Sequence, residues 1–139
     1  MKIRECYVSN SSSSSYIIEF KDLFQTIRIA GEEISVQDFF NAIEINRYDS
    51  DTEMKEIVIN DKESKHSLLE RINGILEWMD DDEYKAEIIV LKRDIENMNS
   101  KKGPYFARFD ISYHNNALNF LYRLLKKYEL FKERYASVG

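Results

Sequence analysis

Side chains able to do catalytic chemistry are few in this sequence and lie far apart. Its 139 residues include one cysteine and two histidines, and Cys6, His114 and Asp110 would make a nucleophile, a base and an orienting carboxylate. Only residue type supports this set, and Cys6 stands close to a serine run that would position it poorly. No nucleotide-binding, zinc-protease, dithiol or serine-esterase motif occurs. The sequence therefore predicts no enzymatic activity, no cofactor and no metal.

The densest cluster of ionisable side chains is acidic and surrounds the single tryptophan. It runs Glu77-Trp78-Met79-Asp80-Asp81-Asp82-Glu83 at the predicted end of a helix, where the dipole disfavours negative charge. Three interpretations stay open: a solvated loop that stops the helix, a divalent-cation site without calcium-loop spacing, and a contact surface for a basic partner. The predicted contact surface comprises Trp78, Asp80, Asp81, Asp82 and Glu83, with Asp49, Asp51 and Glu53 from a polar loop.

Charge is divided unevenly along the chain. Residues 1–100 carry 12 Lys and Arg against 22 Asp and Glu, a net of −10; residues 101–139 carry 8 against 3, a net of +5, so the whole chain is at −5. Because phosphate contacts need basic side chains, the acidic excess argues against dedicated binding of nucleic acid or of a membrane surface. The last predicted helix is the one segment basic enough to bind nucleic acid, and its basic residues are Arg123, Lys126, Lys127, Lys132 and Arg134. The opposed charges would also suit contact between copies in a homo-oligomer.

A run of small hydroxyl residues occupies positions 9–15, interrupted only by Asn10. Such side chains bond to nearby backbone and bury little surface, which predicts a flexible or partner-dependent segment over residues 1–15. Two functional interpretations stay open. The hydroxyls would accept a phosphate or a sugar, or they would cradle an anion with the backbone amides. The residues concerned are Ser11, Ser12, Ser13, Ser14 and Ser15.

Strands and helices alternate along the sequence and must position these groups. Hydrophobic periodicity predicts strands at 16–20, 26–30, 57–59, 86–91 and 105–113, with helices at 35–46, 67–79 and 115–135. Residues 99–104 are predicted to turn a hairpin between the last two strands. The order β-β-α-β-α-β-β-α predicts an α+β fold in a single domain over 1–139, with helices packed on a mostly antiparallel or mixed sheet.

Capping residues and apolar stripes mark the predicted helices. Ser35 with Asp38, and Ser67 with Glu70, are capping boxes, and Asn115 or Asn116 would cap the last helix. Gly74 suggests a close packing contact. The predicted buried stripes are Val36, Phe39, Phe40 and Ile43; Leu68, Ile72, Ile75 and Met79; and Ala117, Leu121, Leu124, Tyr128, Phe131 and Tyr135.

The N-terminal motif Tyr7-Val8-Ser9-Asn10, followed by a serine run and Tyr16, carries a resemblance. Preceded by Met1-Lys2-Ile3-Arg4, it resembles a recurring opening of small uncharacterised proteins of bacteriophages and their Gram-positive hosts. The resemblance covers about the first 18 residues and departs from the pattern at Cys6 and in its tyrosines, where phenylalanine is usual. It implies a phage or prophage accessory protein but transfers no activity. With no predicted signal peptide or membrane span and a single cysteine, the expected place is the cytoplasm of the bacterial host.

Three functions follow as hypotheses. The leading one is a non-enzymatic, phage-type accessory protein that binds a host macromolecule, as an inhibitor of a host enzyme or of an anti-phage defence system, through its acidic surface. The second is a small-ligand domain for a nucleotide or an anion, or a minor enzyme, using Arg108, Asp110 and His114. The third is a structural, self-assembling subunit.

Overall fold

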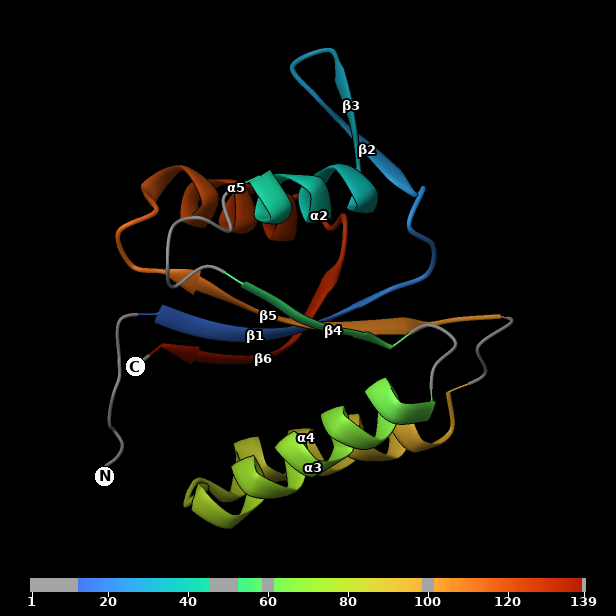
Figure 1. Ribbon diagram of the computed structural model, residues 1–139, viewed down its shortest axis with the longest axis vertical. Helices are drawn as coiled ribbons and strands as arrows, with labels where there is room; N and C mark the ends of the chain where they lie inside the picture. Colours follow the sequence, from blue (N-terminus) through green and yellow to red (C-terminus); the bar gives the residue numbers. More distant parts are fainter. Residues whose placement is uncertain (1–12, 46–52, 59–61, 99–101, 139) are drawn as a thin grey trace.

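A four-stranded antiparallel sheet with helices on both faces forms the body of the protein (Figure 1). The computed structural model describes residues 13–45, 53–58, 62–98 and 102–138. The elements are β1 (Ser13–Phe20), β2 (Thr26–Ile29), β3 (Glu32–Ser35), α2 (Val36–Ile45), β4 (Glu53–Val58), α3 (Lys62–Trp78), α4 (Asp82–Glu96), β5 (Tyr105–Ser112), α5 (Asn116–Lys127) and β6 (Lys132–Val138). The strand order is β4-β5-β1-β6, and β2 and β3 form a separate hairpin. The predicted α+β class, with helices on an antiparallel sheet in one domain, is confirmed.

The two faces of the sheet have separate cores. Helices α2 and α5 cover the upper face in Figure 1, and α3 and α4 cover the lower face. Because side chains alternate along a strand, β1 sends Tyr16 and Ile18 into the upper core and Ile17 into the lower one. Strand β5 divides in the same way, with Phe109 above and Phe106 below.

The serine run enters the most central part of the sheet. Strand β1 pairs with β5 along its whole length, from Ser13 opposite Ser112 to Phe20 opposite Tyr105, and its other edge pairs with β6. Ser13–Ser15, which the sequence analysis assigned to a flexible or partner-dependent segment, are instead part of β1, where Ser13 pairs with β5 and Ser14 and Ser15 pair with both β5 and β6. Residues 1–12 lie outside the described residues.

Helix α2 begins as the sequence predicts. The Ser35 hydroxyl accepts a hydrogen bond from the Asp38 N–H at 3.0 Å, and the Asp38 carboxylate accepts one from the Ser35 N–H at 2.8 Å. All four residues of its predicted apolar stripe are buried: Val36, Phe39, Phe40 and Ile43. The capping box and the stripe are both confirmed.

The lower layer differs from the prediction in its second half. Residues 86–91 lie inside helix α4 and do not form a strand, so no hairpin joins them to β5. Ile88, Leu91 and Ile95 are buried at helical spacing, whereas Ile89 and Val90 are 44% and 43% exposed. Helix α3 begins at Lys62, five residues before the predicted start, and a Cβ on Gly74 would meet no atom within 4 Å. The predicted close contact at Gly74 was therefore wrong.

The last predicted helix is a helix followed by a strand. Helix α5 ends at Lys127, and Glu129 has a φ of +61°, in the left-handed region. The Glu129 and Leu130 N–H groups donate to the carbonyls of Lys126 and Leu125, both at 3.0 Å, in the pattern of a Schellman motif. Glutamate at the position where glycine is usual hid this stop from sequence analysis.

Candidate functional site

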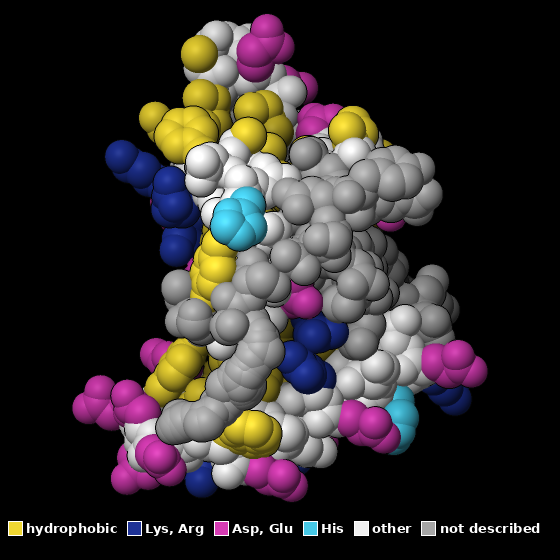
Figure 2. All heavy atoms as spheres, turned by 60° about the vertical axis from the view of Figure 1, so that its left-hand side comes forward, with side chains coloured by type: hydrophobic (Ala, Val, Ile, Leu, Met, Phe, Trp, Pro, Cys, Tyr) yellow, Lys and Arg dark blue, Asp and Glu magenta, His cyan; other side chains and the backbone are white. Residues whose placement is uncertain are grey.

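The predicted partner surface has its centre at the turn between α3 and α4. Trp78 ends α3 with 68% of its surface exposed, and Asp80, Asp82 and Glu83 are exposed beside it. Figure 2 shows acidic side chains gathered at the lower end of the molecule, where these helices lie. We refer to Trp78 and Asp80–Glu83 as the α3–α4 tip.

Helix capping accounts for part of this acidic run. Asp81 is the N-cap of α4, and its Oδ1 accepts hydrogen bonds from the N–H groups of Glu83 at 3.0 Å and Tyr84 at 3.2 Å. Asp82 and Glu83 lie in the first turn of α4, where the helix dipole favours negative charge. The sequence analysis considered only the helix that this run ends, whereas in the structure the same run also begins α4.

The other predicted acidic contacts are only partly within the described ranges. Asp49 and Asp51 lie outside them, and Glu53 is the first residue of β4, in register with Asp110 of β5. A contact surface that includes these three residues stays a prediction.

The serines proposed for modification have different surroundings. Ser11 and Ser12 lie outside the described residues. Ser14 is 3% exposed, and the Ser15 hydroxyl donates a 2.7 Å hydrogen bond to Oδ1 of Asp110. A phosphate or sugar on Ser14 would have to displace the packing around it, so its burial counts against modification in the folded strand.

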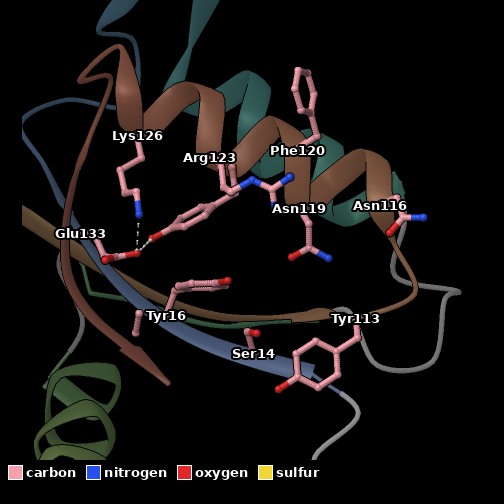
Figure 3. Close-up of a pocket in the computed structure, with 11 residues that line it drawn as sticks. Ser14, Tyr16, Tyr113, Asn116, Asn119, Phe120, Arg123, Lys126 and Glu133 are labelled. Carbon is pink, nitrogen blue, oxygen red and sulfur yellow. Dashed lines mark hydrogen bonds and ion pairs between the residues drawn. The ribbon is translucent and has the colours of Figure 1, made fainter. Parts of the chain in front are cut away.

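A pocket of about 710 Å³ lies between α5 and the sheet (Figure 3). The figure shows polar and aromatic side chains on both sides of it: Ser14, Tyr16 and Tyr113 on the sheet side, and Asn116, Asn119 and Arg123 on the helix side. We call it the α5 pocket. Its volume is within the range of roughly 300–1,000 Å³ that small-molecule sites occupy.

Positive charge is in excess in the α5 pocket. Glu133 Oε1 accepts a 2.7 Å hydrogen bond from the Tyr122 hydroxyl and lies 3.4 Å from Nζ of Lys126. Lys126 and Glu133 therefore neutralise each other. Arg123 forms no ion pair with any other residue that the structure describes, so its guanidinium gives the pocket a net positive charge.

Asn119 is held firmly on the helix side of the pocket. Its Nδ2 donates to the carbonyl oxygens of Ser112 at 2.9 Å and Asn115 at 3.0 Å, which engages both amide hydrogens. Asn115 is the observed N-cap of α5, and its Oδ1 accepts from the Leu118 N–H at 3.0 Å. These bonds fix the orientation of Asn119 and leave its Oδ1 as an acceptor for a ligand.

Two tyrosines of the pocket have raised pKa values. Burial is the main cause for both Tyr16 and Tyr122. At Tyr16 the hydrogen bond with Ser14 lowers the pKa in part, whereas at Tyr122 the bond to the Glu133 carboxylate raises the pKa further. Both groups stay neutral phenols at physiological pH, and Tyr122 is buried with its hydroxyl bonded to Glu133, so the Tyr16 hydroxyl is the one that can serve a ligand.

The α5 pocket was not predicted, because the predicted apolar stripe put the wrong face of α5 in the core. The buried residues are Leu118, Tyr122 and Leu125, one position on from the predicted stripe. Ala117 is exposed and Tyr128 is 49% exposed, so their predicted burial was wrong. A signal was present in the helical spacing of polar Asn116, Asn119 and Arg123.

The alternative site predicted from Arg108, Asp110 and His114 has mixed surroundings. Arg108 is only 9% exposed in the middle of β5, and Asp110 accepts the hydrogen bond from Ser15. His114 is exposed in the turn before α5, where its backbone N–H donates to the Ser112 hydroxyl at 3.2 Å. Cys6 lies outside the described residues.

Metal ligands do not cluster in the part of the chain that the structure describes, where no three His, Cys, Asp or Glu side chains come together in a way that could hold an ion. Among the same residues, no helix has the length and apolar character needed to cross a membrane. No family model, no curated protein and no solved structure matches the chain.

Proposed function

We propose that this protein binds a small anionic ligand in the α5 pocket. One observation supports this most strongly: Arg123 keeps a positive charge in a pocket whose other charges, Lys126 and Glu133, are paired with each other. Arg123 is an exposed residue of the pocket lining, and a cation that no neighbouring carboxylate neutralises attracts an anion.

Hydrogen-bonding groups around this charge would orient the ligand. The Tyr16 hydroxyl and the Asn119 amide oxygen face each other across the pocket, one from β1 and one from α5 (Figure 3). A ligand that reaches both would connect α5 to the centre of the sheet. Its binding would therefore stabilise the packing of the upper layer.

Thermal unfolding tests this function. We expect inorganic phosphate, a carboxylate such as citrate, or a nucleotide to raise the unfolding midpoint, and the increase should follow the logarithm of the ligand concentration above its dissociation constant. A ligand at 100 times its dissociation constant adds about 2.7 kcal/mol of stability. Arg123→Gln should abolish the increase. Lys127→Gln, which removes a neighbouring exposed charge of the same helix, should preserve it. No stabilisation by any of these anions, or equal loss in both variants, would contradict the proposal.

A second candidate function is the binding of a macromolecular partner at the α3–α4 tip, and the exposure of Trp78 favours it. An exposed tryptophan is a frequent interface anchor, and Asp80, Asp82 and Glu83 would steer a basic partner. The partner class that we propose is a host enzyme or an anti-phage defence protein with a basic groove, in keeping with the resemblance of the N-terminus to phage proteins. A self-assembling role stays a prediction.

Association kinetics test the second candidate. A host-lysate protein retained by the wild type would be identified and its association rate measured with Asp80→Lys and Trp78→Ala. We expect Asp80→Lys to slow association and to weaken its dependence on salt, because the steering charge is reversed. Glu32→Lys, the same charge change on the β2–β3 hairpin, is the control. An unchanged rate and salt dependence in Asp80→Lys would exclude the tip.

A further inference from the structure

We propose that the anion bound in the α5 pocket is a nucleotide, with its base against Tyr113 and its phosphate at Arg123. This inference rests on the proposed function, since it names the ligand of the same pocket. It follows from three features of the pocket that the binding of a simple anion would not require. They are the aromatic ring of Tyr113, the hydrogen-bond acceptor Oδ1 of Asn119, and a volume of about 710 Å³.

Tyr113 offers the surface for the base. It lies just past the end of β5, and its ring is among the side chains that line the pocket (Figure 3). The ring of Tyr16 packs against Tyr122, with centroids 4.2 Å apart, and the hydroxyl of Tyr16 faces the pocket. A flat ring entering between the sheet and α5 therefore meets the Tyr113 face, and such stacking tolerates any base.

Asn119 supplies the acceptor for the base edge. Because both of its amide hydrogens are donated to backbone carbonyls, the side chain presents Oδ1 alone. An oxygen acceptor suits the amino or imino N–H groups that nucleobases carry, and a carboxylate or phosphate would be repelled by it. Asn119 therefore suits the N–H donors of the ligand, and Arg123 suits its anionic oxygens.

Arg123 stands one helical turn beyond Asn119, on the same side of α5. A guanidinium binds phosphate oxygens through two parallel N–H bonds, and Arg123 has no competing ion pair among the described residues. Figure 3 shows its guanidinium over the pocket, toward Asn119. The contacts at Asn119 and Arg123 are therefore close enough to be made by one nucleotide.

Phe120 distinguishes two sources of this ligand. Its ring is 59% exposed at the pocket rim and points away from the sheet. A free mononucleotide in the pocket would not need it. A nucleotide that is part of a single strand would place its neighbouring base there, with the exposed Lys127 one to two turns further along α5 available to the next phosphate.

Titration calorimetry on the full chain tests this inference, with AMP, UMP, adenosine, inorganic phosphate and an oligothymidylate of eight residues as probes. We expect at least one mononucleotide to bind about tenfold more tightly than both adenosine and phosphate.

The variants test the individual contacts. Arg123→Gln should weaken nucleotide binding about tenfold and leave the affinity for adenosine unchanged. Tyr113→Leu should weaken nucleotide binding, Tyr113→Phe should preserve it, and Lys127→Gln is the mononucleotide control. Circular dichroism would verify that each variant is folded.

The outcomes separate this inference from the function on which it rests. Binding of inorganic phosphate through Arg123, with no gain in affinity from a base, would overturn the nucleotide proposal and leave the small-anion pocket standing. No binding of any probe would overturn both. Tighter binding of the oligothymidylate than of UMP, lost in Phe120→Ala, would assign the nucleotide to a single strand, and equal binding would assign it to a free nucleotide.

Discussion

The upper and lower faces of the sheet are closed by different kinds of side chain. Above, aromatic rings pack on one another, and Phe39 lies at ring-centroid distances of 5.3 Å from both Phe109 and Phe131. Below, the core is mostly aliphatic, and Arg134, whose side chain is 10% exposed, pairs with Glu19 and Asp94. The upper core therefore depends largely on contacts between aromatic rings, and the smaller lower core depends on aliphatic contacts together with a nearly buried ion pair.

This difference shows where the molecule can hold a ligand and where it can present a surface. The upper layer is made of single helices, and its large rings leave the α5 pocket between helix and sheet. The lower layer is a hairpin of α3 and α4, and it buries Leu68, Ile72, Ile88 and Leu91 against the sheet. The turn between these two helices is the acidic α3–α4 tip. The pocket and the tip thus belong to opposite layers and can be altered separately.

The largest expected effect is in the aromatic core. Phe39→Ala should lower the free energy of unfolding by about 4 kcal/mol, because a fully buried ring is lost and a cavity remains. Ile72→Ala on the lower face should cost less, about 3 kcal/mol. Chemical denaturation of both variants measures the difference. A smaller loss for Phe39→Ala than for Ile72→Ala would contradict the dependence of the upper face on contacts between aromatic rings.

The ion pair of the lower face should come next. Arg134→Ala should lower the free energy of unfolding by about 2–3 kcal/mol, because it leaves Glu19 without its cation and removes packing over the Phe106 ring. Lys126→Ala, which breaks the more exposed pair with Glu133, should cost at most about 1 kcal/mol. Equal losses in urea denaturation would show that burial does not strengthen the Arg134 pair.

Alkaline pH should act on the upper face through Tyr122. Its pKa is raised far above the value of about 10 that tyrosine has in an unfolded chain, so above pH 10 the unfolded state loses a proton that the folded state keeps. Stability is therefore complete below pH 10 and falls above it, by up to about 1.4 kcal/mol per pH unit for each such tyrosine. Tyr122→Phe should flatten this decline between pH 10 and 11. Phe109→Leu, a core change without a titrating group, should lower stability and leave the slope unchanged.

The smallest effect should come from the capping carboxylate of the tip. Asp81→Ala should cost about 1 kcal/mol, because it removes the acceptor for the Glu83 and Tyr84 N–H groups at the start of α4. Asp80→Ala, one residue earlier and exposed, should stay within about 0.5 kcal/mol of the wild type. Similar values for the two variants in thermal denaturation would mean that the cap does not stabilise α4.

Local signals were sufficient for one helix and for the faces of the strands. The Ser35 and Asp38 bonds that begin α2 lie within four residues of one another, and the alternation along β5 is a property of any strand. Both could therefore be predicted without knowing the rest of the fold. The exposed Trp78 and its acidic neighbours were also found from residue type and order alone.

Where the hydrophobic pattern fits two structures equally well, local signals could not decide between them. Residues 86–91 are apolar enough for a strand, but Ile88, Leu91 and Ile95 also fit one face of a helix, and packing against α3 selects the helix. On α5 two apolar stripes lie one residue apart. The choice of Leu118, Tyr122 and Leu125 for the core turned Asn119 and Arg123 toward the pocket.

The amino-acid sequence by itself determined the α+β class, the start of α2, the alternation of side chains across the strands and the division of charge, because each depends on neighbouring residues or on composition. Only the tertiary structure decided that Ser13–Ser15 form the central strand, that β6 follows α5, and that the α5 pocket exists. These features depend on the free energy of contacts between segments about 100 residues apart, such as β1 with β5 and β6. Such contacts have no local signature in the chain.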